Sequence, residues 1–66
     1  MVFSTVLEIN GNPTVYNVYR NEGMAFFSPS QITKAPILFA SYDESSWTIK
    51  GTDDDGVLKQ VLKEIE

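Results

Sequence analysis

The stretch GTDDDGVLKQVLKEIE, residues Gly51–Glu66, decides the fold because it carries the one convincing helical pattern in the chain. At about 100° per residue its apolar side chains fall in one stripe roughly 140° wide, and charged and amide side chains fill the rest of the wheel. A helix of this length is marginal alone in water, so the stripe must pack against another surface. The stripe consists of Val57, Leu58, Val61, Leu62 and Ile65.

The start of this helix is marked by residues that favour a helix N-terminus. Thr52, Asp53 and Asp54 are all good N-cap types, and Asp55 stands three residues after Thr52, as in a weak capping box. Three carboxylates also suit the positive end of the helix dipole. Gly56 costs about 1 kcal/mol inside a helix. We therefore expect the regular helix to begin close to Gly56.

The residues before the helix predict a series of short strands separated by turns. Asn10-Gly11 is the strongest hairpin motif, because both residues accept a positive φ. Pro13 lacks a backbone donor, so we expect it at a strand margin. The expected strands are Val2–Ile9, Thr14–Arg20, Met24–Phe27, Ile37–Tyr42 and Trp47–Lys50.

Residues 28–36 do not fit a regular central strand, because they contain two prolines and two serines. In this segment Ile32 is interpreted as a lone apolar anchor for a loop. The sequence therefore predicts a single α+β domain over residues 1–66, an antiparallel β-meander of four to five strands with one C-terminal amphipathic helix packed on one face. The expected core contains Leu7, Ile9, Val15, Phe39, Trp47, Ile49, Leu58, Val61, Leu62 and Ile65.

Most of the strands are apolar on both faces, and one helix covers only one face of a sheet. The other face requires curling of the sheet, cover by residues 28–36, or a second molecule. A contiguous apolar patch of several hundred Å² is unusual on a monomer, and a two-fold homodimer is the commonest way to bury one. We assign the interaction surface to Tyr16, Val18, Phe27, Leu38 and Tyr42.

The size of the chain also favours self-association. A chain of 66 residues builds only one small core, and domains of this size often need disulfides, metals or oligomerisation. There is no Cys and no His, so disulfides and the usual zinc sites are excluded. Oligomerisation is the support that remains.

The charge distribution disfavours nucleic acids and anionic membranes as partners. The net charge of −4 comes from residues 42–66, where seven acids stand against three lysines. No apolar run is long enough to span a membrane, and MVFSTVLEING at the N-terminus does not resemble a signal peptide. Together with the absence of Cys, these features predict a cytoplasmic protein.

The residues that could carry chemistry are few. Asp53, Asp54 and Asp55 could hold a divalent cation, but their consecutive spacing does not match an EF-hand loop and is what helix capping predicts. Glu8, Asp43 and Glu44 are the carboxylates that could form an acid–base pair. Without His, Cys, or a nucleotide-binding or nucleophile motif, we expect no enzyme, no cofactor and no metal site.

The function predicted on these grounds is a small non-catalytic interaction module that binds itself or another protein through an apolar sheet face or edge. One alternative is a small-ligand-binding protein or accessory enzyme subunit, which would show a closed apolar pocket with convergent polar groups. A second alternative is a single-stranded nucleic-acid binder that stacks bases on the sheet aromatics. The acidic charge disfavours this second alternative.

Overall fold

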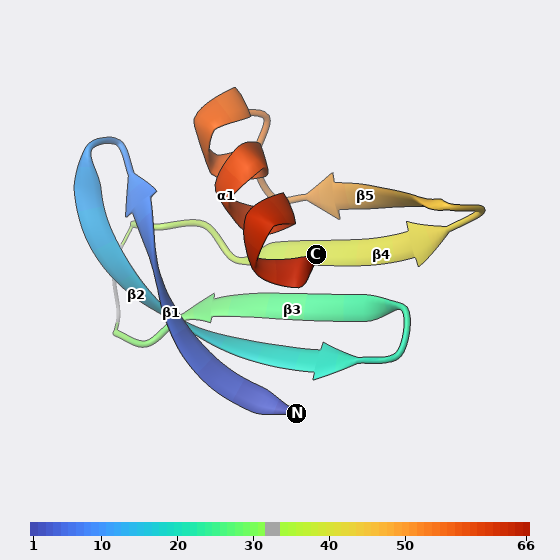
Figure 1. The fold of residues 1–66 in the computed structure, drawn as a ribbon. Helices are drawn as coiled ribbons and strands as arrows, with labels where there is room; N and C mark the ends of the chain where they lie inside the picture. The colour runs from blue at the N-terminus through green and yellow to red at the C-terminus, as the bar shows by residue number, and fades with distance from the viewer. Residues whose placement is uncertain (32–33) are drawn as a thin grey trace.

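The computed structural model describes residues 1–31 and 34–66, and it contains five strands and one helix (Figure 1). All neighbouring strands pair antiparallel in the order β1-β2-β3-β4-β5, which confirms the predicted α+β meander. Ile32, the expected loop anchor, lies outside the described residues. The elements are β1 (Val2–Ile9), β2 (Asn12–Asn21), β3 (Met24–Pro29), β4 (Leu38–Asp43), β5 (Ser46–Lys50) and α1 (Asp55–Ile65).

Two-residue turns set the register of three of the four strand pairs. Asn10 and Gly11 have φ values of 53° and 81°, so the predicted hairpin turn is confirmed, and it pairs Ile9 with Asn12. The turn between β4 and β5 is less favourable, because Glu44 and Ser45 also have positive φ values, 50° and 78°, without being glycine. Local strain is therefore concentrated in the β4–β5 hairpin.

β3 and β4 are connected by residues 30–37 and not by a two-residue turn. The Tyr16 hydroxyl donates a hydrogen bond of 2.7 Å to the carbonyl oxygen of Pro36, which ties this segment to β2. At the end of β5, Gly51 has a φ of 110°, and a Cβ atom there would lie 2.2 Å from the carbonyl oxygen of Ile37. Only glycine allows the two backbones to approach this closely.

The core lies between one face of the sheet and α1. Leu7, Ile9, Val61 and Ile65 are buried there, as the sequence predicts. Trp47, Ile49 and Leu62 are only partly buried against this cluster, and Leu58 is also half-buried. The complete set of buried core residues is Leu7, Ile9, Tyr16, Val18, Ala25, Phe27, Leu38, Ala40, Val57, Val61 and Ile65.

Two members of the expected core were assigned to the wrong sheet face. Val15 is 47% exposed, and Phe39 is only half-buried. Thr5 pairs with Tyr16, so Val15 lies on the face of β2 opposite α1. Likewise Phe27 pairs with Leu38, so Phe39 lies on the face of β4 opposite α1. β2 and β4 carry apolar residues on both faces, so alternation alone does not identify the buried face.

The N-terminus of α1 is capped by one of the three predicted candidates. Asp54 is the N-cap, and its carboxylate accepts a hydrogen bond from the backbone N–H of Val57 at 3.1 Å. The Thr52 hydroxyl accepts a hydrogen bond from the backbone N–H of Asp54, so it supports the cap without forming the expected capping box.

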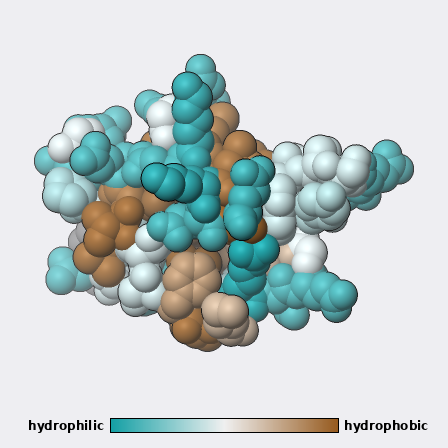
Figure 2. Space-filling view, in the orientation of Figure 1, coloured by the Kyte–Doolittle hydropathy of each residue, from teal (hydrophilic) through white to brown (hydrophobic). Residues whose placement is uncertain are grey.

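Figure 2 shows a mainly hydrophilic surface over the region where α1 lies in Figure 1.

Side chains of α1 also contact the backbone of β1 directly. Gln60 accepts a hydrogen bond of 2.7 Å from the N–H of Glu8 and donates one of 2.9 Å to its carbonyl oxygen. The amide of Gln60 therefore satisfies the groups that a neighbouring strand would otherwise pair. One turn along the helix, Thr5 donates its hydroxyl to Glu64. These contacts hold α1 against one edge of the sheet.

We predict that the buried stripe of α1 contributes much of the stability. Val61→Ala is expected to lower the free energy of unfolding by about 2 kcal/mol, because it removes two buried methyl groups and leaves a cavity. Lys63→Ala on the exposed side of the helix is expected to change it by less than about 0.5 kcal/mol. Urea unfolding measures both, and equal effects would show that the helix packs by another face.

Burial of Tyr16 also creates a pH dependence. Desolvation raises the pKa of the Tyr16 phenol above its ordinary value of 10.0, because the phenolate loses its hydration in the core. The folded chain therefore holds this proton more tightly than the unfolded chain does. The resulting stability is fully present below the unfolded pKa and is lost as the pH rises through the folded pKa.

We predict that Tyr16→Phe reduces this alkaline loss of stability. At neutral pH the substitution is expected to cost about 1 kcal/mol, because the carbonyl of Pro36 loses its donor. Urea unfolding at neutral pH and between about pH 9 and 11 measures both effects. Tyr42→Phe, at an exposed tyrosine, is the control. Parallel loss of stability in wild type and Tyr16→Phe would assign the alkaline transition to another group.

Candidate functional site

The structure corrects the residues assigned to the interaction surface. Tyr16, Val18, Phe27 and Leu38 have no exposed surface, because they lie on the sheet face that α1 covers. Tyr42 remains 48% exposed on the same face, and its ring contacts Trp47 edge-on at 5.2 Å. The candidate surface is therefore the sheet face opposite α1, which we call the outer face.

The turns hold a sequence signal that identifies this face over the first three strands. A two-residue turn at Asn10-Gly11 pairs Thr5 with Tyr16, and a second two-residue turn at Glu22-Gly23 pairs Val18 with Phe27. Paired residues project from the same face of a sheet. The length of the two turns therefore identifies which residues of β2 and β3 share the face of Leu7. The alternation of apolar residues alone does not identify them.

The outer face carries a continuous row of apolar side chains across the strands. Val2 pairs with Tyr19, Tyr19 with Phe26, and Phe26 with Phe39. The rings of Tyr19 and Phe26 are 6.1 Å apart, a distance at which aromatic rings contact. Phe39 pairs in turn with Lys50 on the last strand. We call Val2, Tyr19, Phe26 and Phe39 the outer row.

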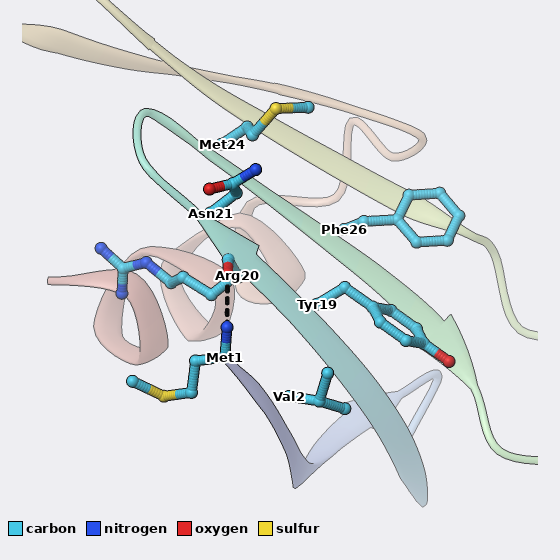
Figure 3. Close-up of a pocket in the computed structure, with 7 residues that line it drawn as sticks. All are labelled: Met1, Val2, Tyr19, Arg20, Asn21, Met24 and Phe26. Carbon is cyan, nitrogen blue, oxygen red and sulfur yellow. Dashed lines mark hydrogen bonds between the residues drawn. The ribbon is translucent and has the colours of Figure 1, made fainter.

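A shallow concavity of about 430 Å³ lies at one end of the outer row. Figure 3 shows Val2, Tyr19 and Phe26 projecting from three neighbouring strands, with the N-terminal amine of Met1 bonded to the carbonyl of Arg20 at the rim. The concavity is open to solvent, since its apolar side chains are 38–83% exposed. An open apolar surface of this kind fits a protein contact better than an enclosed small-molecule site. Its lining residues are Met1, Val2, Tyr19, Arg20, Asn21, Met24 and Phe26.

The outer face has almost no charge at its centre. Along the strands its charged residues are Glu8, Asp43 and Lys50, and each lies at the end of its strand. The acidic excess lies in the other layer, since the segment 53–66 holds five acids and two lysines. The molecule therefore presents one face with an uncharged centre and one acidic face.

The candidate chemical groups do not gather into a site. Glu8 lies near the β1–β2 turn, whereas Asp43 and Glu44 lie at the β4–β5 turn, at the opposite end of the antiparallel sheet. Asp54 is engaged in capping α1. Across residues 1–31 and 34–66 the structure shows no group of three His, Cys, Asp or Glu side chains placed to hold a metal ion.

Two further findings bear on function. Within the described ranges, no helix combines the length and apolar character needed to cross a lipid bilayer. Comparison of the chain with protein-family models, curated proteins and solved structures found no match. The geometry of the molecule is therefore the basis for proposing a function.

We predict that Asp54 acts as a helix cap and that the acidic run binds no specific metal. Asp54→Ala is expected to lower the free energy of unfolding by about 1 kcal/mol, and Asp53→Ala by less, because Asp54 makes the capping bond. Millimolar calcium is expected to raise the melting temperature no more than sodium at matched ionic strength. A saturable binding curve with a micromolar midpoint in calorimetry would contradict this prediction.

Proposed function

We propose that this protein is a non-catalytic interaction module that associates with a second copy of itself through the outer face. The observation that carries the proposal is the outer row, in which Tyr19 and Phe26 are 48% and 38% exposed at the middle of the sheet. Exposed aromatic residues grouped on one face are typical of interface centres. Scattered single apolar residues would carry no such meaning.

The dimensions of the molecule suit a dimer. Its Cα atoms extend 33 × 25 × 16 Å, so the chain is a thin two-layer plate. A plate of this outline offers a face of the same order as the ~800 Å² that each partner buries in a standard interface. Two sheets packed face to face lie about 10 Å apart and build a second core between them. A domain this small gains stability from such a core.

The charge distribution favours a second copy over an unrelated polyanion. When two outer faces meet, the two acidic helix layers point away from each other and lie further apart than the Debye length of about 8 Å. The centre of the contact holds no charge to be desolvated. A phosphate backbone on the same face would meet Lys50 but also Glu8 and Asp43. The outer face therefore favours self-association.

We predict that Phe26→Lys halves the mass of the particle in solution. Phe26 lies on the central strand, where a new charge in the contact would have to be buried without a partner. Multi-angle light scattering at micromolar concentrations measures the mass. Asn12→Lys adds the same charge beside a turn, on a residue paired with the buried Ile9, and is expected to leave the mass unchanged.

Two results would contradict the proposal. One is a wild-type mass of a single chain that does not change over a tenfold range of concentration. The other is an unchanged mass after Phe26→Lys in a variant whose circular dichroism matches that of wild type. A single-chain wild type would direct the search to another protein as the occupant of the outer face.

A further inference from the structure

We infer that the free edge of β1 pairs with β1 of a second copy, in antiparallel orientation, around Ser4. This inference deepens the proposed function, and it rests on the self-association proposed above, but it uses a separate surface. It would join two five-stranded sheets into one continuous sheet across a two-fold axis that is perpendicular to the sheet.

The orientation of the backbone groups of β1 follows from its first pair. The Met1 amine donates to the carbonyl of Arg20 at 3.0 Å, and the N–H of Arg20 donates to the carbonyl of Met1 at 2.8 Å. In an antiparallel pair, residues that exchange both bonds alternate with residues that exchange none. Val2, Ser4 and Val6 therefore direct their N–H and C=O groups away from β2. Because β1 is the first strand in the sheet order, these groups lie at the edge of the sheet.

The outward backbone groups of the β1 edge are hydrogen-bonded at its C-terminal end only. Glu8, the next residue in this alternation, has both backbone groups bonded to the amide of Gln60. Beside Val6, an open concavity of about 210 Å³ lies between β1 and α1. The free segment of the edge is therefore Val2–Val6.

The free segment lacks the features that normally protect an edge strand. Proteins place lysine, proline, bulges or inward-pointing charges on exposed edges to prevent pairing. The segment VFSTV contains none of these residues, and β1 pairs with β2 over its whole length in a regular register. An unprotected regular edge accepts another extended strand through its main-chain hydrogen bonds.

The side chains indicate that the incoming strand is β1 of a second copy. The outer-face residues of the segment read Val2, Ser4, Val6, which is a palindrome about Ser4. Antiparallel pairing centred on Ser4 places each Val2 opposite the Val6 of the other copy, and the two serines opposite each other. Apolar cross-strand pairs stabilise a sheet. Each Glu8 then lies beyond the paired segment, so no like charges are opposed.

The edge contact and the outer-face contact use different surfaces, so both can form in one closed assembly. Perpendicular two-fold axes generate a tetramer, a common symmetry for soluble oligomers. In this assembly wild type has the mass of four chains. Phe26→Lys removes the face contact and leaves an edge-paired dimer of two chains.

The test uses Ser4→Pro in the Phe26→Lys background, with light scattering as the measurement. Proline removes the outward N–H of residue 4 without removing a backbone hydrogen bond to β2. The hydrogen bond of 3.4 Å from the Ser4 hydroxyl to the Asn17 side-chain oxygen is lost both in this variant and in Ser4→Ala, so the comparison of the two variants isolates the N–H. The mass is expected to fall from two chains to one. Ser4→Ala in the same background keeps the N–H and is expected to keep two chains. A single-chain mass for Phe26→Lys alone, or two chains after Ser4→Pro, would overturn the inference.

Amide hydrogen exchange gives a second readout that does not depend on the folding of the proline variant. In the Phe26→Lys protein, the amides of Ser4 and Val6 are expected to exchange at least tenfold more slowly at high concentration than after dilution to single chains. Fast exchange of both amides at every concentration would overturn the edge contact. An equal mass for Phe26→Lys and wild type would instead overturn the face contact, so the two proposals fail separately.

Discussion

The structure depends on one packing contact, the burial of the apolar stripe of α1 against one face of the sheet. Val57, Val61 and Ile65 reach this face at helical spacing, and their partners project from the first four strands. Neither layer is stable alone in water, because a short helix is marginal and a meander with one bare face exposes its core. The cap at Asp54 and the close approach at Gly51 orient the helix so that this contact can form.

The same contact explains why the opposite face remains open. Residues 1–31 and 34–66 supply one helix for a five-stranded sheet, and the helix lies on the side of Leu7. The outer row of Val2, Tyr19, Phe26 and Phe39 is then left in contact with water. Larger domains cover such a face with a second layer of their own chain. Here we propose that a second copy covers this face.

The helix also divides the β1 edge into two parts. Gln60 closes the edge at Glu8 by bonding both of its backbone groups, which is a role usually taken by a neighbouring strand. The remaining part, Val2–Val6, is regular and has no charged or proline residue to prevent pairing. In the edge contact that we propose, strand addition is limited to this short segment. The outer face lies opposite the acidic segment 53–66, whereas the edge segment touches it at Thr5, whose hydroxyl donates to Glu64.

The sequence by itself determined the elements, their order, and the core-facing sides of α1 and β5, because turn residues and apolar periodicity are local properties. The length of the turns also sets the register of the first three strands. Apolar alternation alone places Val15 in the core in place of Tyr16. Only the tertiary structure decided that Leu38 lies under the helix and Phe39 on the outer face. No two-residue turn links β3 to β4, and β4 is apolar on both faces, so its register depends on how the connecting segment packs, with Pro36 bonded to Tyr16 and Ile37 against Gly51.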